Sequence, residues 1–317
     1  MANHVRAVSI CLSIILVNCT FELAYSQNEA GPGSENIKST PKLEIPKLNA
    51  QEAVIEHTGY SLSFNDEYKL ANWVAYDLTR EETRGTSERT NNFIPDPLVP
   101  TGIASDEDYQ NSGYDRGHLA PAADMAWSPA AMAESFYSSN MSPQNQGFNR
   151  GIWKKLELLV RKWAEQYESV YIVTGPVLTA DLPKIGIHNV AVPNYFFKVI
   201  LDYTEPGLKG IGFIVANEKS REPLQDYAIT IDSVERVTGI DFFPLLPDDQ
   251  EWIIESTVNI NDWSWESSDP SGSVDSKSSE KKDQPVSVQC SGTTKSGLRC
   301  KRMTKSPNGK CREHGGD

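Results

Sequence analysis

The chain has 317 residues, of which 38% are apolar, and a formal net charge of −13 at pH 7. This is enough apolar material for a globular core, and the length allows two domains. The acidic balance argues against a protein that coats nucleic acid through bulk positive charge. The charge is uneven, because residues 290–317 hold seven Lys and Arg against two acidic residues, a net +5 that leaves −18 on the remainder. We interpret the tail as an appended basic module.

The first 26 residues predict a cleavable secretory signal. Arg6 precedes an uncharged, mostly apolar run from Ala7 to Val17, and Ala24 and Ser26 are small residues at the two positions that a signal peptidase recognises. The run is too short for a comfortable membrane span. Lipid attachment at Cys19 is the weaker alternative. We expect cleavage after Ser26 and a soluble protein that is secreted or periplasmic.

Composition divides the rest of the chain into four segments. Residues 27–48 are rich in Pro, Gly and polar side chains and predict a flexible leader. Residues 49–266 predict one main domain, residues 267–289 form a Ser/Lys/Asp-rich linker, and residues 290–317 form a Cys/His module. The main domain contains no cysteine, so its core must depend on burial of apolar side chains rather than on disulfides.

Within the main domain, period-2 and β-branched patterns predict strands at residues 60–65, 71–79, 170–177, 194–203 and 210–217. Residues 149–170 predict a helix, because an apolar stripe recurs there at helical spacing, namely Ile152, Leu156, Leu159, Val160 and Trp163. A second helix is expected at Ile231–Thr238, ending at Gly239. Strands outnumber helices, so we expect an α+β fold with a mostly antiparallel central sheet flanked by helices.

The stretch YDRGHLAPAADM, residues 114–125, places Arg116 and His118 around Gly117. An imidazole titrates near neutral pH and can take a proton from water. A guanidinium is a planar, permanently charged group that suits phosphate oxygens. Taken alone, the pattern is weak evidence for catalysis, since a histidine in a turn is more often solvated or capping.

A second polar stretch strengthens the case. Residues 138–153, SSNMSPQNQGFNRGIW, are expected to form a loop that opens the helix. Asn149, Glu157 and Arg161 fall within about 120° of arc on that helix, beside the apolar stripe. An Asn carbonyl is a hard oxygen ligand that Mg²⁺ accepts, and Glu157 could hold metal-bound waters. The alternative is a Glu157–Arg161 pair at i,i+4 with Asn149 as N-cap, and both interpretations can hold together.

These motifs, with the supporting stretches NWVAYDLT, VYIVTGPV, VPNYFFKVI and VERVTGIDFF, resemble the DNA/RNA non-specific endonucleases, whose active site is a ββα-metal motif. The resemblance covers roughly residues 55–245. It implies that His118 is the general base and that Asn149 is the single protein ligand of a hydrated Mg²⁺, with Mn²⁺ as the alternative ion. The remaining implied roles are Asn140 positioning the base, Glu157 binding metal waters, and Arg116, Arg161 and Arg89 holding phosphate. Asp115 is expected to be structural and to order the turn by accepting bonds from backbone N–H groups.

The resemblance implies hydrolysis of DNA and RNA phosphodiester bonds by water that His118 deprotonates, leaving 5′-phosphate ends. The motif offers no set of side chains for reading bases, so binding should be independent of sequence. Two alternatives remain open. One is a catalytically inactive nucleic-acid-binding protein on the same scaffold, and the other is a phosphodiesterase that acts on another phosphodiester.

The C-terminal segment carries the pattern Cys290-x₉-Cys300-x₁₀-Cys311-x₂-His314. Three thiolates and one imidazole would fill a tetrahedral Zn²⁺ site. The alternatives are one disulfide with a leftover thiol, or a disordered tail. The seven cations of this segment favour contact with nucleic acid or with another anionic surface.

Overall fold

A computed structural model describes residues 42–99, 104–265, 288–293, 300, 302–304 and 310–315. The expected signal peptide and most of the expected leader and linker lie outside the described residues. The chain divides into two compact units, Met1–Asp262 and Trp263–Asp317. None of the described helices is both long and apolar enough to cross a bilayer.

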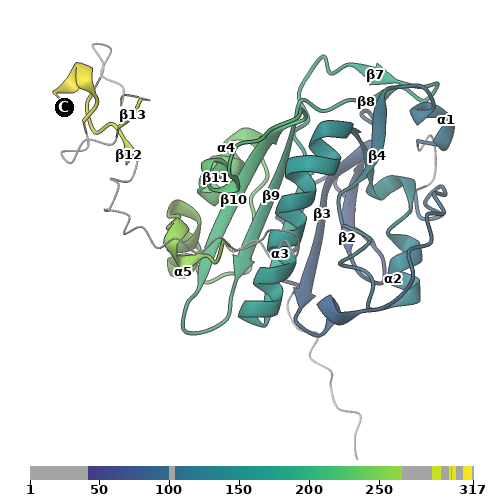
Figure 1. Cartoon of the computed structure of the whole chain (residues 1–317), viewed down its shortest axis with the longest axis horizontal. Helices are drawn as coiled ribbons and strands as arrows, with labels where there is room; N and C mark the ends of the chain where they lie inside the picture. Colours follow the sequence, from purple (N-terminus) through teal and green to yellow (C-terminus); the bar gives the residue numbers. More distant parts are fainter. Residues whose placement is uncertain are drawn as a thin grey trace, which may run out of the picture. The chain divides into compact units, whose positions relative to one another are not determined.

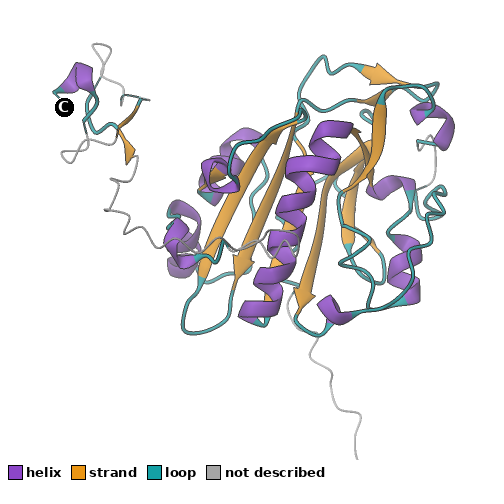
Figure 2. Ribbon diagram, in the orientation of Figure 1, coloured by secondary structure: helices purple, strands orange, loops and turns teal. Residues whose placement is uncertain are grey.

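The first unit is built on a seven-stranded sheet in which every neighbouring pair is antiparallel (Figures 1 and 2). In spatial order the strands are β1 (Ile55–Glu56), β2 (Ser61–Asn65), β3 (Leu70–Thr79), β6 (Ser169–Pro176), β9 (Tyr195–Asp202), β10 (Lys209–Ala216) and β11 (Ala228–Ile229). Each of the five predicted strands is present. The predicted α+β class is confirmed.

Helices cover both faces of this sheet. Consecutive side chains of a strand point to opposite faces, and on β9 Phe196 packs against Trp153, just before α3 (Lys154–Tyr167), while Phe197 packs against Phe242. Phe197 and Phe242 share a core cluster with Ile231 of α4 (Ile231–Thr238) and with Ile254 of α5 (Asp248–Ser256). Thus α3 lies on one face, and α4 and α5 lie on the other.

The bounds of α4 agree with the sequence. The Thr230 hydroxyl accepts a bond from the N–H of Ser233 at the start of the helix, and Gly239 ends it with φ +73°. Shorter elements surround the sheet, and these are α1 (Asp106–Tyr109), α2 (Pro129–Glu134), β7 (Lys184–Ile185), β8 (Val190–Ala191) and the 3₁₀ turns Glu82–Arg84, Ser138–Asn140, Leu224–Tyr227 and Ile260–Asp262. In the second unit β12 (Val288–Gln289) pairs with β13 (Met303–Thr304), and Arg312–His314 forms a 3₁₀ turn.

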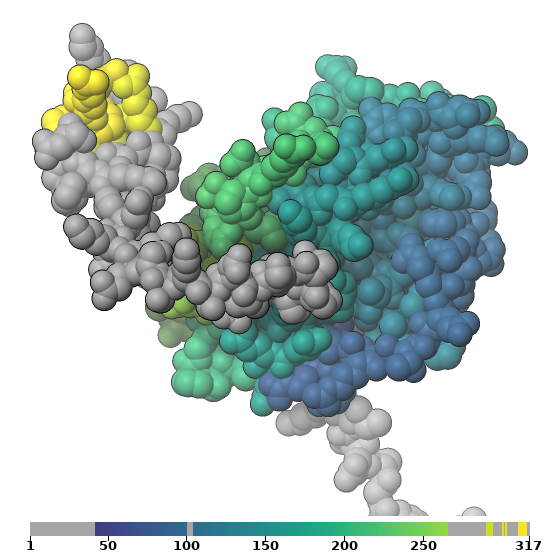
Figure 3. Space-filling model, in the orientation of Figure 1, coloured from purple at the N-terminus to yellow at the C-terminus, as the bar shows by residue number. Residues whose placement is uncertain are grey.

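A two-stranded ribbon lies beside α3 and corrects one prediction. Residues 114–118 form β4 (Tyr114–His118), and Met141–Asn145, expected to be loop, form β5. The register pairs His118 with Met141. These polar stretches contain Gly and Pro and have low intrinsic strand propensity. Their strand conformation therefore depends on the pairing between β4 and β5. Figure 3 shows the blue surface of β4 and its neighbouring segments beside the teal surface that includes α3.

The helix that follows β5 also begins differently from the prediction. Phe148–Trp153 form a wide π-helical turn with a kink at Gly151, where φ is −111° and ψ is −108°, and regular helix begins at Lys154. Asn149 therefore lies in the kinked turn and does not cap the helix. The succession β4, β5 and α3 forms the ββα arrangement that the resemblance implied.

Candidate active site

His118 ends β4 in an apolar environment. Its ring lies edge-on to Phe136 at a centroid distance of 4.9 Å and to Phe93 at 5.9 Å, and the residue is 9% exposed. The Nε2 atom is enclosed and has no hydrogen-bond partner among the described residues. Burial, together with the positive charges of Arg89 and Arg116, lowers the pKa of His118 from 6.5 to about 3. The imidazole is therefore neutral at physiological pH, the form in which it can accept a proton.

Two predicted phosphate-binding arginines lie around this histidine. The Arg89 guanidinium lies 4.8 Å from the centre of the Phe136 ring, and that of Arg116 lies 3.9 Å from the centre of the Phe93 ring. The same two phenylalanines contact His118. Arg116 also forms an ion pair with Asp106 of α1. The aromatic rings thus hold both cations near the imidazole.

Asn140 positions the chain rather than the imidazole itself. Its Oδ1 accepts a bond from the N–H of Ala120 at 2.9 Å, and its Nδ2 donates to the carbonyls of Ala120 at 2.9 Å and Ser135 at 2.8 Å. The side chain is completely buried. Because Ala120 is two residues beyond His118, these bonds fix the backbone that leaves β4. No bond from Asn140 to the imidazole is present among the described residues.

Asp115 has a structural role, as expected, but it bonds to side chains rather than to the backbone N–H groups that were predicted. Its carboxylate accepts a bond from the Nδ2 of Asn149 at 2.9 Å and two bonds from Arg150, at 2.8 and 2.7 Å. Its partners are therefore side chains of the kinked turn rather than backbone N–H groups of its own turn. One result is that the Asn149 amide is tied to β4 through its nitrogen, which leaves its carbonyl oxygen free to bind a cation.

Gly117 lets β4 and β5 approach each other closely. A Cβ atom at this position would lie 2.0 Å from the Cδ of Gln144 on β5. Only a residue without a side chain lets the two strands pair here with Gln144 in its present place.

Glu157 and Arg161 project from α3 into a buried charged group. Arg161 forms an ion pair with Asp124, whose other oxygen accepts a 2.9 Å bond from the Tyr76 hydroxyl. The predicted Glu157–Arg161 ion pair is absent among the described residues, since Arg161 pairs with Asp124 instead. Burial and the negative charge of Asp124 raise the pKa of Glu157, although Lys198 and Arg161 oppose the shift. Asp124 belongs to YDRGHLAPAADM, but nothing in that motif singled it out as a partner of Arg161.

Lys198 is the second member of this group that the sequence did not suggest. It is completely buried on β9, its Nζ has no hydrogen-bond partner within the described chain, and the amine lies 5.0 Å from the centre of the Trp153 ring. Burial lowers its pKa, and the negative charges of Glu157 and Asp124 oppose that effect. Within the apolar run NYFFKVILDY, a single lysine would ordinarily be assigned to an exposed edge position.

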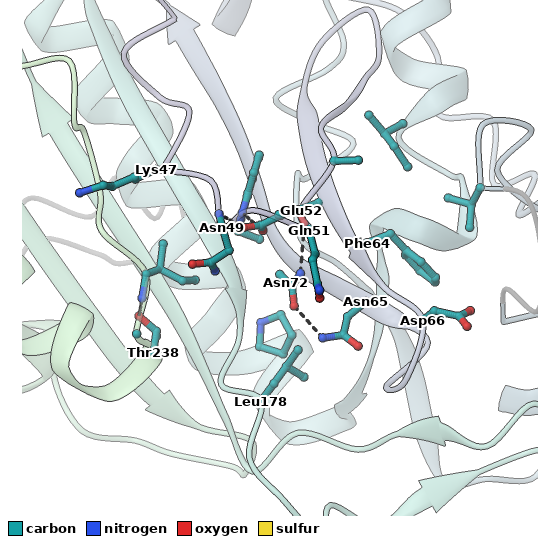
Figure 4. A pocket seen from close by; sticks show the side chains of 18 residues that line it. Lys47, Asn49, Gln51, Glu52, Phe64, Asn65, Asp66, Asn72, Leu178 and Thr238 are labelled. Carbon is teal, nitrogen blue, oxygen red and sulfur yellow. Dashed lines mark hydrogen bonds between the residues drawn. The ribbon is translucent and has the colours of Figure 1, made fainter.

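One cavity among the described residues is separate from this group. It has a volume of about 710 Å³ and is lined largely by polar side chains (Figure 4). Asn65 donates to Asn72 at 2.9 Å across it, and Trp73 donates to Glu52 at 2.8 Å. Trp73 belongs to the core cluster beneath α4, so the cavity is on the face of the sheet opposite to α3. Neither His118 nor Asn149 lines it.

In the second unit the four predicted zinc ligands converge. The Sγ atoms of Cys300 and Cys311 are 3.9 Å apart, and the Nδ1 of His314 is 3.4 Å from the sulfur of Cys290 and 3.3 Å from that of Cys311. The Cys290 sulfur also accepts bonds from the backbone N–H groups of Gly292 and Cys311. All three cysteines are free thiols rather than members of a disulfide. The ligand atoms of the four residues lie within 4.8 Å of one another.

Comparison with known proteins gives the family. The family model of DNA/RNA non-specific endonucleases matches residues 41–249, about two thirds of the chain. The chain belongs to the DNA/RNA non-specific endonuclease family. The mouse mitochondrial nuclease EXOG is 34% identical over 233 residues, which cover 63% of each chain. The zebrafish protein of the same name is 33% identical over 243 residues, covering 71% of this chain and 70% of that one.

A second group of relatives is named endonuclease G. The bovine mitochondrial protein is 36% identical over 203 residues, covering 58% of this chain and 67% of its own. A crystal structure of the EndoG/EndoGI complex, concerned with the mechanism of EndoG inhibition, matches with a TM-score of 0.61 and 32% identity. It covers 66% of this chain and 91% of that chain. The chain thus spans under two thirds of the mouse relative's length, and its β4–β5–α3 motif lies within the region that the family model matches.

Proposed function

We propose that the protein is a Mg²⁺-dependent endonuclease that hydrolyses phosphodiester bonds of DNA and RNA irrespective of sequence and leaves 5′-phosphate ends. The observation that carries this proposal is His118, a histidine kept neutral beside two arginines. A neutral imidazole accepts a proton from water, and guanidinium groups bind the phosphate that the water attacks. Membership of the non-specific endonuclease family supports the same activity.

The surroundings of His118 indicate which nitrogen does the work. Since Nε2 is enclosed and has no partner in the described part of the chain, we infer that the attacking water approaches Nδ1. Phe93 and Phe136 hold the ring in one orientation and keep its environment apolar. The proton therefore moves from water to Nδ1 while the resulting hydroxide attacks phosphorus.

Arg89 and Arg116 would bind the non-bridging oxygens of the same phosphate. Arg116 is held by Asp106, whose side chain is 61% exposed, so a phosphate dianion or diester can displace that carboxylate. Arg89 is exposed and forms only a 2.8 Å bond with Asn91 among the described contacts of its polar atoms. Both arginines can thus bind substrate without breaking a buried interaction.

The residues around Asn149 fit a Mg²⁺ ion, with Mn²⁺ as its substitute. Asp115 fixes the amide nitrogen and so orients the carbonyl oxygen, a hard ligand of the kind this ion accepts. Glu157, whose carboxylate makes no hydrogen bond within the described chain, would hold waters of the ion's hydration shell. When bound, the ion stabilises negative charge on the phosphate and on the leaving oxygen.

The decisive test is digestion of plasmid DNA and of RNA with Mg²⁺, with EDTA, and with His118→Ala. Loss of the general base should reduce the rate by about 10²–10⁴-fold. The matched control is His188→Ala, which removes a partly exposed histidine that bonds Asp108 and should retain activity. Digestion by His118→Ala at the parental rate would refute the assignment, as would full activity in EDTA.

We also propose that the chain is exported after cleavage behind Ser26. Support comes from the apolar run between Ala7 and Val17 and the small residues that follow it. N-terminal sequencing of the protein isolated from its source should begin at Gln27. The mammalian and fish relatives are mitochondrial by name, and an intact Met1 or a mitochondrial location would contradict export.

For the second unit we propose a structural Zn²⁺ held by Cys290, Cys300, Cys311 and His314. Ligands at 2.3 Å for sulfur and 2.0–2.1 Å for nitrogen place tetrahedral S–S pairs about 3.8 Å apart and S–N pairs about 3.5 Å apart. The observed separations of 3.9, 3.4 and 3.3 Å agree. The purified full-length protein should contain one zinc, and His314→Ala combined with Cys311→Ser should lose it. The basic residues of this unit support a role as a tether for nucleic acid.

A further inference from the structure

Three carboxylates converge between α4 and α5, on residues that the proposed function does not use. Asp232 and Glu235 lie three residues apart on one face of α4, and Glu255 lies near the end of α5. One oxygen from each lies within 4.8 Å of the other two. Like charges so placed repel, and burial strengthens the repulsion.

The burial of Glu255 makes this arrangement more than an acidic surface. The residue is 6% exposed, and its Oε1 is enclosed without a hydrogen-bond partner in the part of the chain that the structure describes. No Lys or Arg of the described chain forms an ion pair with any of the three carboxylates. Asp241 and Glu251 add further negative charge around Glu255. A buried, unpartnered carboxylate oxygen is costly unless a positive charge or a proton satisfies it.

We propose that Asp232, Glu235 and Glu255 bind a divalent cation of the calcium class. Three carboxylate oxygens within 4.8 Å of one another are close enough to share one cation. Calcium takes six to eight oxygen ligands in flexible geometry and readily binds several carboxylates. Magnesium demands near-octahedral geometry, keeps several waters and is usually held by only one or two carboxylates. The Phe242 N–H donates to the Oε1 of Glu235 at 2.9 Å, which holds this carboxylate in place and leaves its second oxygen for the ion.

The cation would join α4 to α5 on the face of the sheet opposite to α3. Both helices bury apolar side chains in one core cluster, namely Ile231 and Val234 from α4 and Ile254 from α5. The site therefore stabilises that layer and contributes no group to phosphodiester hydrolysis. This separation makes the proposal independent of whether the nuclease assignment holds.

The test is thermal unfolding of the full chain carrying Asn149→Ala, which removes the proposed magnesium ligand. Adding about 1 mM CaCl₂ after EDTA treatment should raise Tm by roughly 8 °C if the ion binds with micromolar affinity. Glu255→Gln keeps the shape of the side chain, and it should fold and lose the calcium response. Asp232→Asn should lose it as well. The control Asp249→Asn, which changes an exposed acidic residue of α5, should keep the calcium response.

Three outcomes would overturn the proposal. The first is a Tm that CaCl₂ leaves unchanged in the Asn149→Ala protein. The second is a calcium response that persists in both Glu255→Gln and Asp232→Asn. The third is an equal response to MgCl₂ at the same concentration, which would contradict the calcium assignment. Nuclease activity is not read in any arm, so failure here leaves the proposed function untouched.

Discussion

The neutral state of buried His118 predicts a specific pH dependence of stability. In the native protein its pKa is about 3, against 6.5 for an unperturbed imidazole. Between these values the unfolded chain binds one more proton than the native chain, so the free energy of unfolding falls as pH falls. The slope approaches 1.36 kcal/mol per pH unit, and integration from pH 7 to pH 5 gives a loss of about 2 kcal/mol from this single group.

The assay is urea denaturation in EDTA of the wild type and of His118→Ala at pH 8, 7, 6 and 5. The variant lacks the titrating group. From pH 7 to pH 5 the wild type should therefore lose about 2 kcal/mol more unfolding free energy than His118→Ala loses. Between pH 8 and pH 7 the two curves should run nearly parallel, since the imidazole is largely neutral in both states. Parallel curves down to pH 5 would show that the native pKa is not depressed, and the case for an enclosed neutral base would fail.

Three further predictions concern residues that support the site. Lys198→Met removes a buried positive charge beside Glu157, so the pKa of Glu157 should rise. The acid limb of the kcat/KM–pH profile should then move to higher pH by roughly one unit. The control Lys154→Met, on the exposed side of α3, should leave the profile in place. Asp115→Ala frees the amide of Asn149 and should raise the Mg²⁺ concentration needed for half-maximal activity by about 10–100-fold; an unchanged requirement would contradict the contact's role. Asn140→Ala leaves the backbone groups around Ala120 unpaired and should lower the free energy of unfolding by about 3 kcal/mol; a change below 1 kcal/mol in urea titration would show that the bonds are dispensable.

Local sequence patterns were sufficient to predict the helices and strands that are determined by residues of the segment itself. Helix α4 was predicted at its observed bounds, because Thr230 caps it and Gly239 takes the left-handed conformation that ends it. The five long strands were also predicted, since alternating and β-branched side chains report burial directly. Strand β5 was missed, because Met141–Asn145 carries no such pattern and depends on pairing with β4.

The same division applies to the site. The motif residues His118, Asn149 and Glu157 could be named from the chain, because their chemistry and their spacing are visible there. The sequence could not show that Arg161 pairs with Asp124, or that Asp115 holds Asn149, since these contacts join residues 37 and 34 positions apart.

The amino-acid sequence by itself determined the family, the α+β class and the residue types that can carry the chemistry. Only the tertiary structure decided their electrostatic state. The low pKa of His118 arises from two phenylalanines and two arginines that the fold brings around one ring. The buried amine of Lys198 and the unpartnered carboxylate of Glu255 likewise acquire meaning from neighbours on other elements. Burial and charge act through space, and a one-dimensional pattern records neither distance nor dielectric surroundings.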